Sequence, residues 1–428
     1  MINSLYHRLW AFFGDLLYRH PSRRIFVVGV TGTKGKSTVL ELLNAIFEEA
    51  GKKTSLLSSV RRKICERESA NLTGNTMPGR FAIQSFLKEA VDCECDYAFI
   101  EVTSQGVLQH RHKHIDWDAA IFLNLSPEHI EAHGSFENYR DAKLEFFKDM
   151  GTSGKPKKSF FINEEDENQK YFEEAARSVS NSRISFFSRE RFVKEDLGAH
   201  YDLSSPQSRR LLGDWLMADF NLENAAAAVA FARDRGVHWK TIKKALDQFR
   251  GVPGRMEFVQ KTPFAAIVDY AHTPDSLQKV YETLERGFLA DSGGELICVL
   301  GAAGGGRDKW KRPVLGRIAA EHCEKIILTD EDPFDEVPAE IIKQVEEGFL
   351  SAAHSRLKPN DYYPILDRKE AIRKAIGLAK KGDVVVITGK GSEPHLRVAK
   401  GKKIPWSDRK EVEAALKARE QEESGWKD

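Results

Sequence analysis

Continuous apolar runs that alternate with helix-periodic segments constrain the fold of this chain more than any other feature. Most of these runs lack the alternation of apolar and polar residues expected of a sheet with one solvent-exposed face. They suit parallel strands buried on both faces. The expected strands are 24–30, 97–102, 119–125, 158–163, 265–270, 295–301, 325–330 and 383–389. The expected helices are 37–50, 80–92, 136–149, 221–235, 239–249, 275–288, 312–323, 337–349 and 369–380. This alternation predicts an α/β protein with doubly wound sheets.

The length of the chain and one short loop predict how these elements divide into domains. A chain of 428 residues usually holds two or three domains. The stretch FRGVPGR, at 249–255, places two glycines and a proline between an expected helix and the next expected strand. We therefore expect a mostly parallel, P-loop-type domain over 24–250 and a Rossmann-like α/β domain over 251–428.

Residues 1–23 form a separate segment with an amphipathic helical pattern. Its apolar residues recur at helical spacing: Ile2, Leu5, Leu9, Phe12, Phe13, Leu16 and Leu17. Charged residues interrupt the pattern, and the segment is too short and too polar to span a bilayer. We expect a helix that docks on the body of the protein, with a helix on a membrane surface as the alternative. The sequence has no other segment near transmembrane length, so we expect a cytoplasmic protein.

The composition excludes several classes of function. The chain has 65 Lys and Arg against 64 Asp and Glu, so no global positive charge points to nucleic acid. Its apolar content of 41% is that of an ordinary globular protein. The five cysteines are odd in number. We interpret them as ordinary thiols and not as a disulfide framework or a zinc site.

A glycine-rich turn with a lysine joins the first expected strand to the helix after it. The stretch GVTGTKGKST, at 29–38, can close backbone amides around phosphate oxygens, and the helix N-terminus and Lys36 add positive charge. The Ser37 hydroxyl is placed to bind a magnesium ion. The spacing differs from the common P-loop, because Val30 stands where that loop has its first glycine. The expected phosphate-binding residues are Gly32, Thr33, Lys34, Gly35, Lys36, Ser37 and Thr38.

Two later strands also end on polar side chains. Glu101 stands at the carboxyl end of a buried strand, where the active sites of open α/β sheets lie, and a carboxylate there can hold magnesium against phosphates. The next strand is followed by Asn124, Glu128, His129 and His133. We expect His129 to bind metal or phosphate, whereas a structural role is the stronger interpretation for His133.

The phosphate loop resembles that of the Mur ligases, in which glycine, threonine and any residue precede glycine and lysine. This family uses ATP to join amino acids to peptidoglycan precursors. The resemblance implies that Glu101 and His129 bind magnesium together with Ser37. It also implies that Lys143, in YRDAKLEFF, becomes carbamylated and faces a second magnesium ion. On this basis Lys36, Glu101, His129 and Lys143 are the expected catalytic residues.

Two stretches of the first domain resemble the tripeptide-synthetase branch of the family. They are LTGNTMPGR, at 72–80, and EVTSQGVLQHR, at 101–111. The resemblance implies that the muramoyl substrate contacts Asn75, Thr76, Thr103, Gln109 and Arg111. Met77 and Gln105 depart from the branch, which has threonine and histidine at these positions.

Three later stretches resemble nucleotide-binding segments of the family. They are MADFNLENAAAAVAFA (217–232), GRMEFV (254–259) and VDYAHTPDSL (268–277). The resemblance implies that ATP contacts Asn221, Asn224, Arg255, Asp269 and His272. From the residues alone, Asn221 and Asn224 are equally well explained as helix N-caps, because asparagine at a helix start needs no ligand.

The amino-acid site is expected in the second domain. The stretches LGAAGGGRDKWKRPVLG (300–316) and ITGKGSEPH (387–395) resemble segments of that site. The resemblance implies that Arg307 grips the α-carboxylate of the incoming amino acid, since a planar guanidinium matches a carboxylate. It implies that Glu393, beside Lys390, holds the ammonium group.

One departure bears on the identity of the amino acid. Members of the family that add diaminopimelate have an arginine where LTDEDPFDE, at 328–336, has Phe334. Glu331 and Asp332 stand just before it. An acidic pocket without the arginine disfavours a distal carboxylate and suits a distal ammonium, so we expect lysine or ornithine to be favoured over diaminopimelate.

The resemblance covers the chain from about residue 24 to residue 410 and implies a complete reaction. ATP would convert a carboxylate of the precursor into an acyl phosphate, which the amino acid attacks, with two magnesium ions assisting. Only ~23 residues precede the first strand, too few for the UDP-binding domain of the family. We therefore expect that domain to be absent, with a partner protein as one candidate for its replacement.

Other functions remain as alternatives. A ligase like folylpolyglutamate synthetase shares this chemistry and also lacks the UDP-binding domain. A ligase acting on a different carboxylate carrier is a further candidate. A non-catalytic Mur-like subunit is disfavoured because Lys36, Glu101 and His129 are all present. A P-loop kinase would leave the amino-acid-like site of the second domain unexplained.

Overall fold

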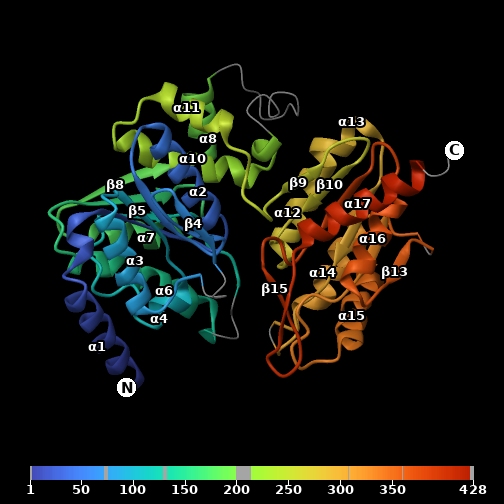
Figure 1. The fold of residues 1–428 in the computed structure, drawn as a ribbon, viewed down its shortest axis with the longest axis horizontal. Coiled ribbons are helices and arrows are strands. Elements are labelled where there is room, and N and C mark those ends of the chain that lie inside the picture. The colour runs from blue at the N-terminus through green and yellow to red at the C-terminus, as the bar shows by residue number, and fades with distance from the viewer. Residues whose placement is uncertain are drawn as a thin grey trace. The chain divides into compact units, whose positions relative to one another are not determined.

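The computed structural model describes residues 2–71, 76–128, 133–198, 214–306, 308–358 and 360–424. The chain forms two compact units, Met1–Arg250 and Gly251–Asp428 (Figure 1). Each unit has its own β-sheet and its own hydrophobic core. The α/β fold class predicted from the sequence is confirmed.

The first unit is built on an eight-stranded sheet in the order β4-β3-β2-β5-β1-β6-β7-β8. Strands β2, β5, β1, β6, β7 and β8 pair in parallel, and β3 and β4 extend the sheet with antiparallel pairing. The strands are β1 Phe26–Thr31, β2 Thr54–Leu57, β3 Arg61–Ile64, β4 Arg67–Ala70, β5 Tyr97–Glu101, β6 Ala119–Phe122, β7 Lys158–Asn163 and β8 Ser182–Phe187. The helices are α1 Ile2–Leu17, α2 Lys36–Glu49, α3 Arg80–Asp92, α4 Ser104–Leu108, α6 Phe136–Asp149, α7 Gln169–Arg177, α8 Arg189–Arg191, α10 Asp219–Asp234 and α11 Trp239–Gln248.

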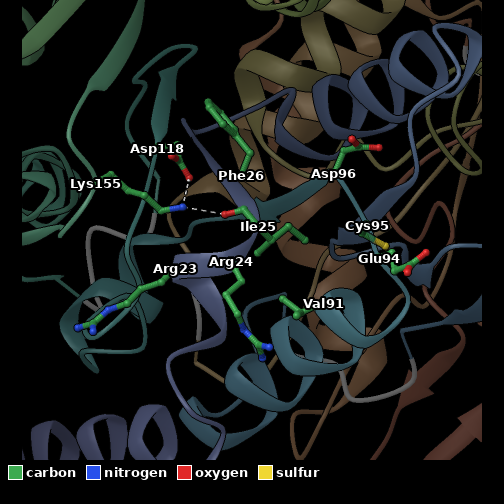
Figure 2. A pocket seen from close by; sticks show the side chains of 10 residues that line it. All are labelled: Arg23, Arg24, Ile25, Phe26, Val91, Glu94, Cys95, Asp96, Asp118 and Lys155. Atoms are coloured by element: carbon green, nitrogen blue, oxygen red, sulfur yellow. Dashed lines mark hydrogen bonds and ion pairs between the residues drawn. The ribbon is translucent and has the colours of Figure 1, made fainter.

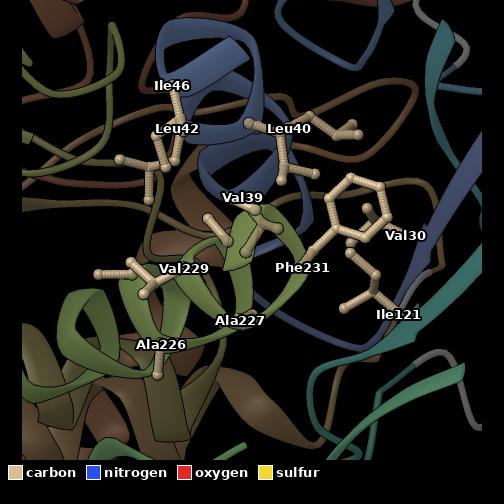
Figure 3. Packing of buried hydrophobic residues seen from close by; sticks show 14 of the residues in the cluster. Val30, Val39, Leu40, Leu42, Ile46, Ile121, Ala226, Ala227, Val229 and Phe231 are labelled. Carbon is tan, nitrogen blue, oxygen red and sulfur yellow. The ribbon is translucent and has the colours of Figure 1, made fainter. Parts of the chain in front are cut away.

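Strand β1 shows why this sheet is covered on both faces. Val28 and Val30 belong to a hydrophobic cluster with residues of α2, α10 and α11. Val27 belongs to a second cluster, with residues of α3, α6 and α7. Successive side chains of a strand point to opposite faces, so one continuous apolar run fills both clusters. Figure 3 shows residues of α2 and α10 packed in the first cluster.

The second unit has a six-stranded sheet in the order β13-β12-β11-β14-β10-β9, in which only the edge strand β9 is antiparallel. A separate hairpin, β15 with β16, follows it in the chain. The strands are β9 Glu257–Gln260, β10 Ala265–Val268, β11 Leu296–Leu300, β12 Lys325–Leu328, β13 Tyr362–Pro364, β14 Val384–Ile387, β15 His395–Arg397 and β16 Lys403–Pro405. The helices are α12 Pro274–Leu284, α13 Ala290–Ser292, α14 Lys311–His322, α15 Pro338–Glu346, α16 Arg368–Leu378 and α17 Asp408–Ser424.

Every strand and helix expected from the sequence is present, with ends that differ by a few residues. The elements that the sequence did not predict are short: β2, β3, β4, β8, β9, β13, β15, β16, α4, α7, α8 and α13. Hydrophobic periodicity detects long elements, whereas strands and helices this short hold too few residues to show a clear period.

Helix α1 forms as expected, but its apolar residues do not all face the protein. Ala11 and Gly14 are buried, and Gly14 lies against Phe81 and Gln84 of α3. The larger residues Phe12, Phe13, Leu16 and Leu17 of the periodic pattern are exposed. The expectation that this pattern marks the docked face is therefore wrong for these four residues.

The interpretation of the cysteines as ordinary thiols is also wrong. Cys65 is joined to Cys93, and Cys298 to Cys323, by disulfide bonds. Cys95 is a buried free thiol. The two bonds each link an element end to a strand or loop far along the chain, a proximity that the tertiary fold creates and that sequence spacing does not reveal.

Candidate active site

The phosphate loop lies between the end of β1 and the start of α2, as the sequence predicts. Gly35 has φ +84, a conformation that side-chain-bearing residues rarely adopt. A Cβ atom on Gly35 would also lie 2.0 Å from Oδ1 of Asn224. This position therefore requires glycine twice over, once for the backbone turn and once for the close contact with α10.

Lys36 folds back over the loop that precedes it. Its ammonium donates hydrogen bonds to the carbonyl oxygens of Gly32 and Thr33, each at 3.0 Å. It also lies 3.8 Å from Oε1 of Glu101. The lysine charge is thus held at the loop, where an incoming phosphate would meet it.

Glu101 ends β5, and its carboxylate is buried beside the loop. Oε2 accepts hydrogen bonds from the Ser37 hydroxyl at 3.0 Å and from the Ser59 amide at 2.9 Å. Ser59, in the loop after β2, was not found from the sequence because nothing local marks it. A carboxylate and a hydroxyl that converge at a phosphate loop are the oxygen donors that Mg²⁺ prefers, so the residues present fit this ion.

Lys143 of α6 reaches the same loop from another direction. Its Nζ is buried and donates to the Gly32 carbonyl at 2.8 Å. Burial, reinforced by the neighbouring Lys36 charge, holds the pKa of Lys143 well below its ordinary value. The Tyr139 hydroxyl, one turn earlier, lies 3.1 Å from the Thr33 hydroxyl. Tyr139 is a second residue of this site that the sequence did not reveal.

The polar residues after β6 hold the other side of the loop. Asn124 accepts a hydrogen bond from the Lys34 amide at 2.9 Å, and the Lys34 ammonium lies 3.1 Å from Glu128. His129 lies outside the described residues, so its expected ligand role stays a prediction. His133 is buried, with Nε2 3.1 Å from the Ser104 hydroxyl at the start of α4.

Asn221 and Asn224 are not helix caps, so that alternative is wrong. The N-cap of α10 is Ala218, which makes no side-chain capping bond. Asn221 donates to the Trp215 carbonyl at 2.6 Å and accepts from Asn224 at 3.2 Å. The pair is buried and brings the start of α10 against the phosphate loop, through the contact of Asn224 with Gly35 described above.

The expected muramoyl contacts gather around the short helix α4. The Thr103 hydroxyl caps α4 by accepting from the Gly106 amide at 3.0 Å. The Arg111 guanidinium donates to the Met77 carbonyl and, at 2.5 Å, to the Gln109 side chain. Through these bonds Thr103, Gln109 and Arg111 each have a structural role, in addition to any contact with a substrate. Thr76 precedes buried Met77, and Asn75 lies outside the described residues.

A buried lysine organises the expected amino-acid site of the second unit. The Lys390 ammonium donates to Asp332 at 2.8 Å and to Glu393 at 2.5 Å, and its side chain is fully buried. Burial opposes ionisation of Glu393, but the Lys390 charge outweighs it and lowers the pKa of Glu393. The Tyr270 hydroxyl donates to the other oxygen of Glu393 at 3.4 Å. Glu393 is therefore held ionised, and Lys390 acts by positioning it.

The VDYAHTPDSL stretch joins β10 to α12 and brings Tyr270 to Glu393. Asp269 accepts from the backbone amides of Met256 and Ala271, both at 2.7 Å. The Arg255 guanidinium lies 3.9 Å from the centre of the Tyr270 ring, a cation–π contact. The structure thus brings Arg255, Asp269 and the Tyr270 turn together, and it leaves Arg307 outside the described residues.

Glu331 and Asp332 do not form an open acidic pocket. Asp332 is paired with Lys390 and also accepts from the Arg397 amide at 2.8 Å. Glu331 is buried against Gly389, and burial raises its pKa to about 7. The charge of Asp332 is paired with Lys390, and burial disfavours the ionised form of Glu331, so the electrostatic argument for a distal ammonium is weakened.

A cavity of about 490 Å³ lies at the amino-terminal ends of β1, β5 and β6 in the first sheet (Figure 2). One of its charged groups is paired within the protein: the Lys155 ammonium contacts Asp118 at 3.0 Å and the Ile25 carbonyl at 2.9 Å. The phosphate loop, Glu101 and Lys143 are not among the residues that line it. The cavity therefore stands apart from the candidate active site.

The sequence matches two known family models and several named ligases. Residues 30–232 match the Mur ligase middle domain, and residues 254–391 match the Mur ligase glutamate ligase domain. The chain is 36% identical to the UDP-N-acetylmuramoyl-L-alanyl-D-glutamate--2,6-diaminopimelate ligase of Syntrophomonas wolfei over 94% of its length and 80% of the relative's. It is 35% identical to the ligase of the same name from Halalkalibacterium halodurans, with the same coverage.

Solved structures agree with this placement. A ligase of that same name has a TM-score of 0.60 at 27% identity, over 96% of this chain and 83% of that one. The folylpolyglutamate synthase of Mycobacterium tuberculosis has a TM-score of 0.65 at 14% identity, which shows a shared fold alone. Together with the phosphate loop and its buried glutamate and lysine, these findings make the chain a member of the Mur ligase family, whose members are ATP-dependent, ADP-forming amide ligases that generally require Mg²⁺.

Proposed function

We propose that this protein joins an amino acid to a UDP-N-acetylmuramoyl-dipeptide-like precursor of peptidoglycan. A carboxylate oxygen of the precursor attacks the γ-phosphorus of ATP, which gives an acyl phosphate and ADP. The amine of the amino acid then attacks the acyl carbon, an amide forms, and inorganic phosphate leaves with the loss of a proton from the amine. The observation that carries this proposal is the convergence of Lys36, Glu101 and Lys143 on one phosphate loop.

The first unit supplies charge stabilisation for phosphoryl transfer. Lys36 would contact the phosphates, and Ser37 and Glu101, with His129, would hold Mg²⁺. Bound Mg²⁺ neutralises negative charge that develops on the transferred phosphoryl oxygens. The lowered pKa of Lys143 favours the neutral amine, which is the form that reacts with carbon dioxide. We propose that Lys143 becomes a carbamate there and faces a second ion.

The second unit supplies the amino-acid site. Glu393, held ionised by Lys390, would bind the ammonium group of the amino acid. Arg307 would bind its α-carboxylate. Lys390 has no exposed surface, so its role is to position Glu393 and not to touch the substrate.

We favour 2,6-diaminopimelate as the amino acid over lysine or ornithine. The similar ligases from Syntrophomonas wolfei and Halalkalibacterium halodurans are named for it. Of the acidic residues that pointed to a distal ammonium, Asp332 is paired with Lys390, and Glu331 is buried with a raised pKa. We also propose a cytoplasmic location, where ATP and nucleotide-linked precursors are available.

The test is phosphate release by the purified chain with ATP, Mg²⁺ and UDP-N-acetylmuramoyl-L-alanyl-D-glutamate, with one amino acid added at a time. We expect turnover with diaminopimelate and a product whose mass matches the new amide. Lys36→Ala and Lys143→Met should each lower the rate by at least ~100-fold, since each removes charge stabilisation at the loop. The matched control is Lys240→Ala, an exposed lysine of α11, which should leave the rate unchanged.

Each alternative outcome has a distinct meaning. Turnover with lysine or ornithine, and none with diaminopimelate, would support the interpretation of an acidic pocket that binds a distal ammonium. The proposed reaction would still hold. If no amino acid gives turnover with this acceptor, the proposal that the substrate is a UDP-N-acetylmuramoyl-dipeptide-like precursor is contradicted. Turnover with a folate and glutamate in its place would assign the chain to the other ligase class.

A further inference from the structure

Helix α1 is amphipathic, but it is docked on the protein by its small and polar side. Ala11 is 1% exposed and Gly14 is buried, which lets the helix approach Phe81 and Gln84 of α3 closely. Asp15 is also on the buried side, where His20 contacts it at 2.6 Å. Figure 1 shows α1, in dark blue, beside α3 at the margin of the first unit.

The opposite side of α1 carries large apolar side chains in contact with solvent. Phe13 is 52% exposed and Leu17 is 67% exposed. Among residues 10–17, the exposed large side chains are Trp10, Phe12, Phe13, Leu16 and Leu17. Trp10 also contacts the Phe81 ring of α3, and Phe12 contacts the His114 ring. Elsewhere in the described residues such side chains are scattered singly along the chain. Phe13, Leu16 and Leu17 stand at i, i+3 and i+4 and therefore share one side of the helix. Exposed apolar side chains grouped in this way on a folded protein mark a binding face.

The charge around this helix indicates what the face binds. Residues 1–24 contain four arginines and one aspartate, whereas the whole chain has a formal charge of +1. The one acid, Asp15, is buried, and the arginines that follow the helix, at 19, 23 and 24, are exposed. Arg23 contacts Asp116 at 3.0 Å, which leaves Arg19 and Arg24 as the stronger positive sites.

We propose that α1 binds the surface of an anionic lipid bilayer, with its aromatic and leucine side chains in the headgroup region and its arginines on lipid phosphates. Trp and Phe with flanking Arg are the side chains that favour this interface. None of the helices in the described part of the chain has the length and hydropathy of a membrane span. The inference does not depend on which amino acid or precursor the ligase uses.

Binding to vesicles tests this inference. The full chain is mixed with vesicles of phosphatidylethanolamine, with or without phosphatidylglycerol, and separated by flotation. We expect binding to the vesicles that contain phosphatidylglycerol, weakened by added salt. The double variant Phe13→Glu with Leu17→Glu should bind at least ~10-fold more weakly, because two apolar side chains no longer leave water.

The control variant is Leu350→Glu, which changes a residue that is 94% exposed in the second unit. It should bind vesicles as the unchanged protein does. Unchanged melting temperatures would show that the variants fold. Absence of binding by the unchanged protein, or equal binding by the double variant, would overturn the proposal. The proposal would also be overturned if the unchanged protein self-associates without binding vesicles and the double variant does not self-associate. The face would then bind a second copy of the chain.

Discussion

Glu331 shows how the surroundings of one residue decide its charge. Its side chain is buried, Oε2 has no hydrogen-bond partner, and a Cβ atom on Gly389 would lie 2.4 Å from that oxygen. Burial raises its pKa from 4.5 to about 7 despite the nearby Lys311 and Arg368. A carboxyl group with a raised pKa binds its proton more tightly in the folded state than in the unfolded state. Its contribution to stability is therefore lost as pH rises from about 4.5 to about 7.

We predict that Glu331→Gln removes this dependence on pH. The free energy of unfolding of the variant minus that of the unchanged protein should increase by roughly 3 kcal/mol from about pH 5 to about pH 8. Urea unfolding of both proteins at the two pH values measures the gain.

Glu336→Gln is the control for this prediction, because Arg312 lowers the pKa of Glu336 to about 2 and the group stays ionised across that range. Its effect on stability should be equal at the two pH values. A Glu331→Gln effect that is equally independent of pH would contradict the raised pKa.

At the scale of elements, one buried ion pair fixes the last helix to the second sheet. Arg368, which begins α16, donates to both oxygens of Asp408, which begins α17, at 2.8 and 2.7 Å. Arg368 also donates to the Thr388 carbonyl at the end of β14, at 2.8 Å. Both side chains are at most 1% exposed.

We predict that Asp408→Asn lowers the free energy of unfolding by ~3–5 kcal/mol, because it leaves the Arg368 charge buried without its counter-ion. Urea unfolding measures the loss. Asp275→Asn is the matched control: this aspartate of α12 forms an exposed pair with Lys279 at 3.2 Å, and such pairs contribute only ~0–1 kcal/mol. Equal losses in the two variants would show that the buried pair does not anchor α17.

At the scale of the whole molecule, the cores of the two units are separate. Both hydrophobic clusters of the first unit draw only on residues before 250, and the cluster around β10, β11 and β14 draws only on residues after 251. The division falls between Arg250 and Gly251. The phosphate loop lies in the first unit and Glu393 in the second, so the proposed reaction would need both.

We predict that residues 251–428, expressed alone, fold cooperatively but release no phosphate from ATP. A domain of this size buries enough apolar surface to be stable by itself. Dispersed amide signals in a ¹H–¹⁵N NMR spectrum and a single thermal transition would confirm folding. A spectrum typical of an unfolded chain would show that the second core depends on the first unit.

The sequence by itself determined the alternation of strands and helices, the phosphate loop and the strand-end position of Glu101. These features follow short-range rules: the period of apolar residues, the freedom of glycine and the burial of a strand. The expected roles of Asn75, His129 and Arg307 stay predictions, because these residues lie outside the described part of the chain. The resemblance of these motifs to the Mur ligases predicted amide ligation in addition to phosphate binding.

Only the tertiary structure decided which side of α1 is docked, that Lys390 is buried beneath Glu393, and that Glu331 has a raised pKa. It also revealed Ser59 and Tyr139 at the phosphate loop. Each of these properties depends on neighbours far away in the chain. Burial and charge pairing arise from such contacts, and no local pattern of residues encodes them.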